Sequence, residues 1–257
     1  MPLTENATAP TTLTVRSLLV WGLLAGLVGG VLAFGFAFVF GEPSVDTAIS
    51  IEEAGADSGH SHGEAAAHEP AEEEEVSRAF QSTGGLGIGT VAYGLGLGGL
   101  FSLAFAFAYG RIGPLTPRAT AVALAGLGYV AVVLVPFLAY PANPPAVGNG
   151  ETIGDRTVLF FGMIGISLVA VVGAIFAARA LTPRVGGWGA TVAAGLGYLV
   201  VVTGVAKLLP TFQEVPAGFP GNVLWEFRIA SLGTSAVLWA GIGIVFAVLL
   251  HRGLSRA

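Results

Sequence analysis

Charge is scarce in this sequence, and cysteine is absent. Asp, Glu, Lys and Arg make up 11% of the 257 residues, whereas a soluble domain carries about 25%. A chain with so few charges cannot cover a water-facing surface, so a soluble globular protein is excluded. The absence of cysteine excludes disulfides and thiolate metal sites, and it gives no indication of the redox compartment.

Long apolar segments take the place of charge. Hydrophobic residues make up 54% of the chain, and its mean hydropathy is +0.78. Six nearly charge-free segments reach the roughly 20 residues that a helix needs to cross a bilayer. They span 17–40, 84–109, 119–140, 157–178, 188–209 and 229–250. A large soluble core would instead show amphipathic segments with a charged face, and none of the six has one.

The sequence therefore predicts an all-α polytopic membrane protein with six transmembrane helices. It divides into a tail over 1–16 and a membrane domain over 17–257, with a long polar loop over 42–83. The first apolar segment has an alternative interpretation as a secretory signal peptide. Its apolar run exceeds the roughly 7–15 residues usual for a signal-peptide core, and no convincing cleavage site follows it, so we expect a retained helix.

Acidic and basic residues divide between alternate connections of these segments. One side holds a single acid, Glu5, and seven basic residues: Arg16, Arg111, Arg118, Arg179, Arg184, Arg252 and Arg256. The other side holds 15 of the 16 acids, with Arg78, Arg156 and Arg228. The positive-inside rule then predicts a cell-membrane protein with both termini in the cytoplasm and the 42–83 loop facing outward.

An internal repeat recurs in the apolar part of the chain. Leu-Thr-Pro-Arg begins at Leu115 and again at Leu181, and Ala-Gly-Leu-Gly-Tyr follows at 125–129 and 194–198. A proline stands 16 residues after that alanine in both copies, at Pro141 and Pro210. The first segment carries a weaker version. These repeats predict helical hairpins arranged with approximate threefold character, although chance similarity between glycine-rich helices is the alternative.

Glycines four residues apart predict which helix faces pack closely. Gly22, Gly26 and Gly30 share one face of the first segment, and the second segment carries the pairs Gly85/Gly89 and Gly94/Gly98. Small residues at this spacing let two helices approach each other in lipid, where no hydrophobic force drives association. Close packing is sufficient to explain these glycines, so we predict no site there.

The apolar segments hold no Asp, Glu or His, and their only ionisable residue is Lys207 near the end of the fifth. Its side chain can extend to the interface. A proton pump or a membrane protease would need carboxylates, histidines or paired catalytic groups at depth. No phosphate-binding loop of the G-x-x-x-x-G-K-[ST] type occurs either. We therefore expect neither an enzyme nor a nucleic-acid-binding protein.

Polar side chains gather at the outward ends of the segments, among prolines that predict extended or turn conformations. Carboxylates, amide oxygens and carbonyls converging there would suit an entrance for cations. The predicted entrance residues are Glu42, Asp46, Asn143, Glu214, Glu226 and Arg228. Ordinary turn chemistry at helix ends is the alternative.

The outward loop contains a second candidate site. His60, His62 and His68, with Glu64 and Glu69, could form a loose shell around a divalent metal. Imidazole suits Co, Ni, Cu and Zn, and the order of complex stabilities does not choose among them. The alternative is a solvated acidic linker whose histidines are incidental.

Four strings give the chain a family resemblance: "FGEP" at 40–43, "YPANPPAVG" at 140–148, "EVPAGFP" at 214–220 and "LWEFRIASLGT" at 224–234. Together they resemble the CbtA-type cobalt transporter subunit family. The resemblance implies a prokaryotic multi-pass protein that imports cobalt for cobalamin synthesis, often beside a small single-helix partner bearing histidines. Cobalt would be the substrate, and no tightly bound cofactor is expected.

Two other functions remain open from the sequence. The protein could be a non-transporting membrane scaffold or a metal sensor. It could also conduct an anionic or complexed solute past Arg78, Arg156 and Arg228.

Overall fold

The computed structural model describes residues 14–59 and 77–255, and this part of the chain is helical with no strand. The helices are α1 (Val15–Phe36), α2 (Glu42–Gly59), α3 (Arg78–Phe80), α4 (Leu86–Ala108), α5 (Pro117–Gly128), α6 (Val135–Ala139), α7 (Ile153–Leu208) and α8 (Gly221–Leu254). Three π-helical segments join them: η1 (Ala37–Gly41), η2 (Gln81–Gly85) and η3 (Tyr129–Leu134). The all-α prediction is confirmed for the described residues.

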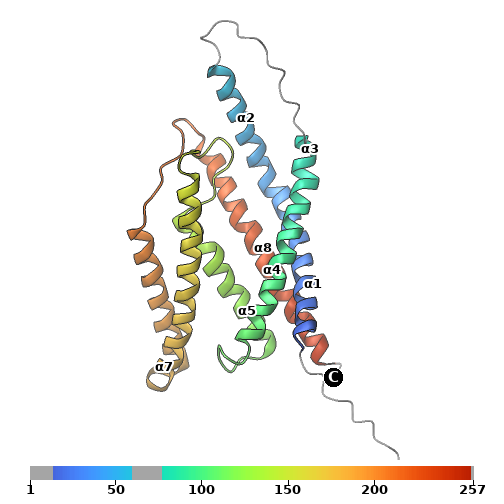
Figure 1. The fold of residues 1–257 in the computed structure, drawn as a ribbon, viewed down its shortest axis with the longest axis vertical. Coiled ribbons are helices and arrows are strands. Elements are labelled where there is room, and N and C mark those ends of the chain that lie inside the picture. Colours follow the sequence, from blue (N-terminus) through green and yellow to red (C-terminus); the bar gives the residue numbers. More distant parts are fainter. Residues whose placement is uncertain (1–13, 60–76, 256–257) are drawn as a thin grey trace, which may run out of the picture.

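Five continuous helices of the described chain are long and apolar enough to cross a membrane: Val15–Gly55, Arg78–Ala108, Pro117–Ala139, Ile153–Leu208 and Gly221–Leu254. The fourth, α7, is 56 residues long and is not straight. Gly186 has a φ of +74°, which is not helical, and Pro183 lies just before it. Figure 1 shows two antiparallel limbs of α7 meeting at a turn. A buried hydrogen bond of 2.8 Å between the hydroxyls of Ser167 and Tyr198 joins these limbs.

The helix that begins at Val15 continues past the point where the sequence predicts an outward loop. The prediction of loop structure from 42 is wrong, because α2 runs from Glu42 to Gly59, and helix resumes at Arg78. Pro43 lies in the first turn of α2, directly after the π-helical η1. A proline is tolerated where the regular hydrogen-bond ladder is already interrupted, as it is in a π-helical turn. Pro43 therefore does not end this helix.

Helix α1 packs against both α4 and α8 along its length. On the α4 side, a Cβ placed on Gly26 would lie 2.1 Å from the Gly94 carbonyl oxygen, and one on Gly22 would lie 2.4 Å from that of Gly98. The predicted close packing of these glycines is confirmed. The prediction is wrong for Gly89, which has open space around its Cβ position.

Two hydrophobic cores hold the helices together. The larger one joins α1, α4, α5 and α8, with Phe101, Phe105 and Phe246 in edge-to-face contact at its centre. The smaller one joins α6 to both limbs of α7 through Val135, Met163 and Val202. Because α5, η3 and α6 are continuous, the chain passes from the first core to the second within one helix, with the π-helical η3 between them.

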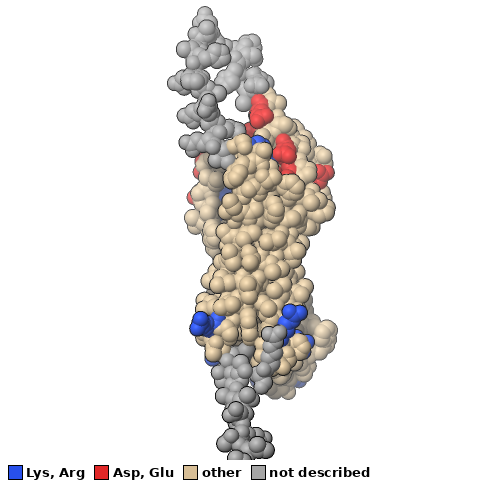
Figure 2. Space-filling model, turned by 90° about the vertical axis from the view of Figure 1, so that its right-hand side faces the viewer, with Lys and Arg blue, Asp and Glu red and all other residues tan. Residues whose placement is uncertain are grey.

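Charge separates along the long axis of the molecule. In Figure 2, acidic side chains lie towards the upper end of the face shown with a few basic ones among them, arginines without acidic neighbours lie towards the lower end, and the band between them is uncharged. We call these the acidic end and the basic end. The acidic end carries the connections 140–152 and 209–220, and the basic end carries the turn between α4 and α5 and the turn at Gly186.

Candidate functional site

A large cavity, which we call the central cavity, lies at the acidic end between α2, α4, η3, α6, α7 and α8. Its volume is about 1630 Å³. The lining is mainly apolar, with Leu97 and Leu100 of α4 and Phe160 and Ile164 of α7. Ile164 is 11 residues beyond Ile153, the first residue of α7, so the cavity reaches about 16 Å along this helix at about 1.5 Å per residue. It therefore extends from the acidic end into the membrane-spanning part of the helices.

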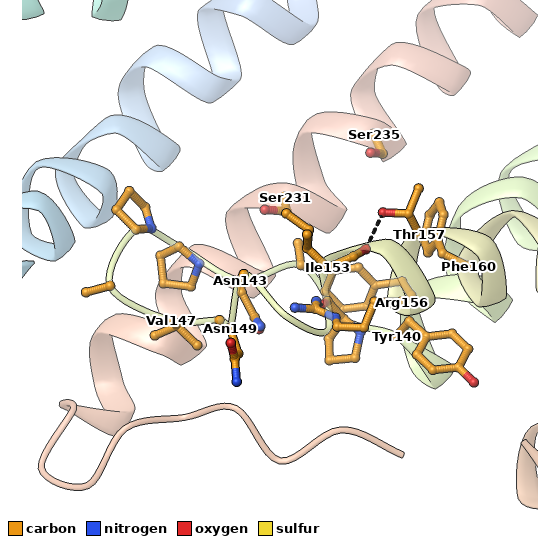
Figure 3. Close-up of a pocket in the computed structure, with 18 of the residues that line it drawn as sticks. Tyr140, Asn143, Val147, Asn149, Ile153, Arg156, Thr157, Phe160, Ser231 and Ser235 are labelled. Carbon is orange, nitrogen blue, oxygen red and sulfur yellow. Dashed lines mark hydrogen bonds between the residues drawn. The ribbon is translucent and has the colours of Figure 1, made fainter. Parts of the chain in front are cut away.

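Hydroxyl and amide groups interrupt this apolar lining. Ser231 and Ser235 of α8 and Thr157 of α7 contribute hydroxyls, and Asn143 and Asn149 contribute amides from the connection above. Figure 3 shows the two serines on α8, the threonine on α7, and the asparagines on the connection that covers the cavity. A few polar groups set in a mostly apolar concave surface are typical of sites that bind small solutes.

A network of polar side chains, which we call the polar cluster, joins four segments beside this cavity. Arg156 of α7 forms an ion pair with Glu214, and the Thr152 hydroxyl donates to the other oxygen of the same carboxylate. Asn143 Nδ2 lies 3.5 Å from Glu214 Oε2. Arg228 of α8 donates from Nη2 to Asn143 Oδ1 over 3.0 Å. The polar cluster therefore links α7, α8 and both connections of the acidic end.

The Glu214 carboxylate is buried among polar partners. Its side chain is only 7% exposed, and that of Arg156 is 21% exposed. Burying a carboxylate is costly unless charged and polar partners surround it, and Glu214 has three such partners. The carboxylate thus fixes the 209–220 connection against the start of α7.

The connection over the cavity is shaped by prolines, as the sequence predicts for 140–148. Tyr140 ends α6, and its hydroxyl donates to Pro210 O over 3.0 Å. Ala146 adopts a φ of +62°, in the left-handed region, within the turn that Val147 N closes onto Pro144 O. The two proline-rich connections are therefore tied together at their bases.

The structure brings three of the six predicted entrance residues together, namely Asn143, Glu214 and Arg228. Glu42 and Asp46 form a separate group on α2, where Arg78 pairs with both. Glu226 is exposed at the start of α8. The sequence-based set omits Arg156 and Thr152, which complete the polar cluster. A signal for Arg156 does exist in the sequence, because it precedes an apolar segment at the acidic end as Arg78 and Arg228 do.

The predicted histidine site, His60, His62, His68, Glu64 and Glu69, lies outside the described residues. Within 14–59 and 77–255, no group of three or more His, Cys, Asp or Glu residues is placed to hold a metal. The metal-binding role of the histidine loop stays a prediction.

These apolar helices and the cavity between them define a polytopic α-helical membrane protein with room for a solute. The chain belongs to the CbtA family, described as probable cobalt transporter subunit, whose model matches residues 15–251. The family resemblance found in the sequence is thereby confirmed. No curated protein and no solved structure matches the chain.

Proposed function

We propose that this protein is the permease subunit of a cobalt uptake system that supplies cobalamin synthesis. The observation that carries the proposal is the central cavity, which reaches into the membrane-spanning region from the acidic end. Membership of a family of probable cobalt transporter subunits supports cobalt as the transported metal. In this role the protein acts on its substrate by binding and release, without enzymatic chemistry.

We further propose six membrane spans, with each limb of α7 crossing once. At about 1.5 Å per residue, a straight helix of 56 residues would extend about 84 Å, far beyond a bilayer core of about 30 Å. The turn at Gly186 supports two crossings instead. Both Leu-Thr-Pro-Arg motifs stand at the basic end: Thr116 caps α5 there, and Pro183 precedes the turn in α7. This common placement supports equivalent hairpins and the predicted approximate threefold character.

The charge separation supports an orientation with the acidic end outside the cell. Arginines of the basic end would then face the cytoplasm, as would both termini. In this orientation the central cavity faces outward, on the side to which the sequence assigns the histidine loop. The cavity is thus placed to receive solute from outside.

Movement of α7 relative to the larger core would change access to the cavity. Helix α7 packs mainly on η3 and α6, whereas α5 packs on α8. A π-helical segment such as η3 is a local weakness in a helix and is frequent at functional sites. We infer that η3 acts as the hinge and that the polar cluster holds the two helical groups together at the acidic end.

The family description as a subunit implies a complex with a partner. Much of α7 is apolar and exposed, including Val169, Trp188 and Val200. Lipid covers such a surface in a membrane protein, and a transmembrane partner helix can replace lipid there. We propose that the partner is the small single-helix, histidine-bearing protein implied by the family resemblance.

We expect cells that produce this protein to accumulate labelled cobalt above the level of cells without it. Competition with unlabelled cobalt, nickel and zinc then ranks the metals. Equal accumulation with and without the protein would show that it is not a cobalt permease. Liposomes containing the purified protein alone test the scaffold or sensor alternative, which predicts metal binding without entry.

Replacing His60, His62 and His68 with alanine should raise the cobalt concentration needed for half-maximal uptake. The maximal rate should stay the same, because the histidines collect metal before it reaches the cavity. Deletion of 57–75 should have the same direction of effect at scarce metal. His251→Ala, at the basic end, is the matched control. An unchanged concentration dependence in the triple variant would support the incidental linker instead.

A further inference from the structure

We propose that Arg228, with the positive charge of Arg156 next to it, forms a binding site for the carboxylates of an anionic metal chelate, beside the central cavity. This inference rests on the proposed uptake function and specifies the form in which the metal arrives. It concerns a site for the ligand that carries the metal, and it does not require the protein to strip that ligand before binding.

The polar cluster contains more positively than negatively charged groups. It contains two guanidinium groups, those of Arg156 and Arg228, and one carboxylate, Glu214, which already accepts hydrogen bonds from Thr152, Arg156 and Asn143. Asp155 and Glu226, the neighbouring acids in α7 and α8, are exposed. Neither forms an ion pair with Arg228 in the part of the chain that is described. The polar cluster therefore has an excess positive charge.

The hydrogen bonds of Arg228 show where that excess charge lies. Its Nε donates to Ala142 O over 3.2 Å, and its Nη2 donates to Asn143 Oδ1, so both protein acceptors are neutral. Nη1 donates to no described residue. Since no buried side-chain nitrogen or oxygen in the described chain lacks a partner, Nη1 of Arg228 reaches accessible space. Its N–H groups remain available to a carboxylate, the anion that a guanidinium binds in a two-pronged arrangement.

The central cavity lies next to the polar cluster and is large enough for a metal chelate. Asn143 and Arg156 line it directly, and Ser231, one turn along α8 from Arg228, lines it as well. A divalent ion with six waters, at about 30 Å³ per water, needs roughly 200 Å³. The cavity offers about 1630 Å³, which is enough for a multi-atom complex. A chelate also supplies its own metal ligands. The cavity itself offers few, because the charged residues in the described part of its lining are one carboxylate, Glu52, and one guanidinium, Arg156.

An anionic lipid headgroup presents oxygen atoms similar to those of a carboxylate chelate. The test must therefore distinguish binding of a soluble chelate from binding of lipid. Citrate without metal is the probe, because it carries three carboxylates and its binding does not depend on cobalt. The full chain is placed in nanodiscs of neutral phosphatidylcholine, and citrate binding is measured by calorimetry. We expect saturable binding that weakens about tenfold in Arg228→Gln, the scale of one lost charge-assisted contact.

Two further variants keep the result interpretable. Arg228→Lys retains the charge but loses the planar fork, so it should bind citrate with intermediate affinity even if Arg228→Gln folds poorly. Glu53→Gln changes an exposed acid of α2 that does not line the cavity, and it should leave binding within about twofold of the wild type, as surface changes usually do. Thermal melting of each variant shows that the compared proteins are folded.

Three outcomes would overturn the inference. They are no saturable citrate binding in neutral nanodiscs, equal binding by folded Arg228→Lys and wild type, or complete loss of binding when phosphatidylglycerol is added to the nanodisc. The last outcome would assign the arginines to lipid. Because the probe contains no metal, cobalt accumulation in cells still tests the permease function separately.

Discussion

Gly94→Ala should destabilise the protein by about 1–3 kcal/mol, the usual cost of adding a methyl group to a close-packed contact. The new Cβ would lie 2.5 Å from the Gly26 carbonyl oxygen and 2.9 Å from Gly30 Cα. Both atoms belong to the backbone of α1, so no side chain can rotate away. The helices must separate, and the contacts that hold α1 against α4 weaken along their length. Unfolding by sodium dodecyl sulfate in mixed micelles measures the free-energy change.

Gly89→Ala is the matched control on the same helix. Its Cβ position has open space around it, and alanine favours helix over glycine by up to about 1 kcal/mol. We therefore expect a neutral or stabilising change, opposite in sign to Gly94→Ala. Equal destabilisation by the two substitutions would contradict the packing of α1 against α4.

The same two glycines show what the sequence can and cannot predict about this fold. The four-residue spacing of small residues identifies faces suited to close contact, and it holds for Gly22, Gly26, Gly94 and Gly98. It fails for Gly89, because spacing says which residues share a face and not whether another helix covers that face. Only the arrangement of α1, α4 and α8 decides which small-residue face is used.

The sequence predicts some helix boundaries of this chain and not others. Apolar length predicts where the five long apolar helices of the described chain lie, because burial in lipid requires long runs without charge. The continuation of helix through Pro43 could not be predicted, since it depends on the π-helical η1 directly before it. At Gly186, by contrast, the gap between the apolar segments 157–178 and 188–209 did predict a break, and the chain turns there.

The sequence predicts which types of residue gather at the candidate site, but it does not predict which of them pair with each other. Prolines and polar residues after the apolar segments identify Asn143, Glu214 and Arg228 as neighbours at one end. The sequence gives no reason for Glu214 to pair with Arg156, which is 58 residues away. Such pairing depends on how the 209–220 connection crosses the start of α7. Sequence reasoning therefore predicts carboxylates for a cation entrance, whereas the described ion pairs place arginines beside Glu42, Asp46 and Glu214.

Glu214→Gln should cost about 3 kcal/mol of stability, at the lower end of the range for breaking a buried ion pair. The substitution keeps the size of the side chain but removes the charge that Arg156 faces. Arg156 would then remain largely buried next to Arg228, with no carboxylate of the polar cluster to balance either. Glu226→Gln, an exposed change at the same end, should alter stability by less than about 0.5 kcal/mol.

A double-mutant cycle isolates the pair from the rest of the polar cluster. If the cost of Glu214→Gln comes from the uncompensated arginine, adding Arg156→Gln should recover part of it. The double variant should then be more stable than the sum of the single changes predicts, by about 1–3 kcal/mol. Strict additivity would mean that Glu214 acts through Thr152 and Asn143 instead, which hold the carboxylate from the other side. The ion pair would then not be what fixes the 209–220 connection beside the central cavity.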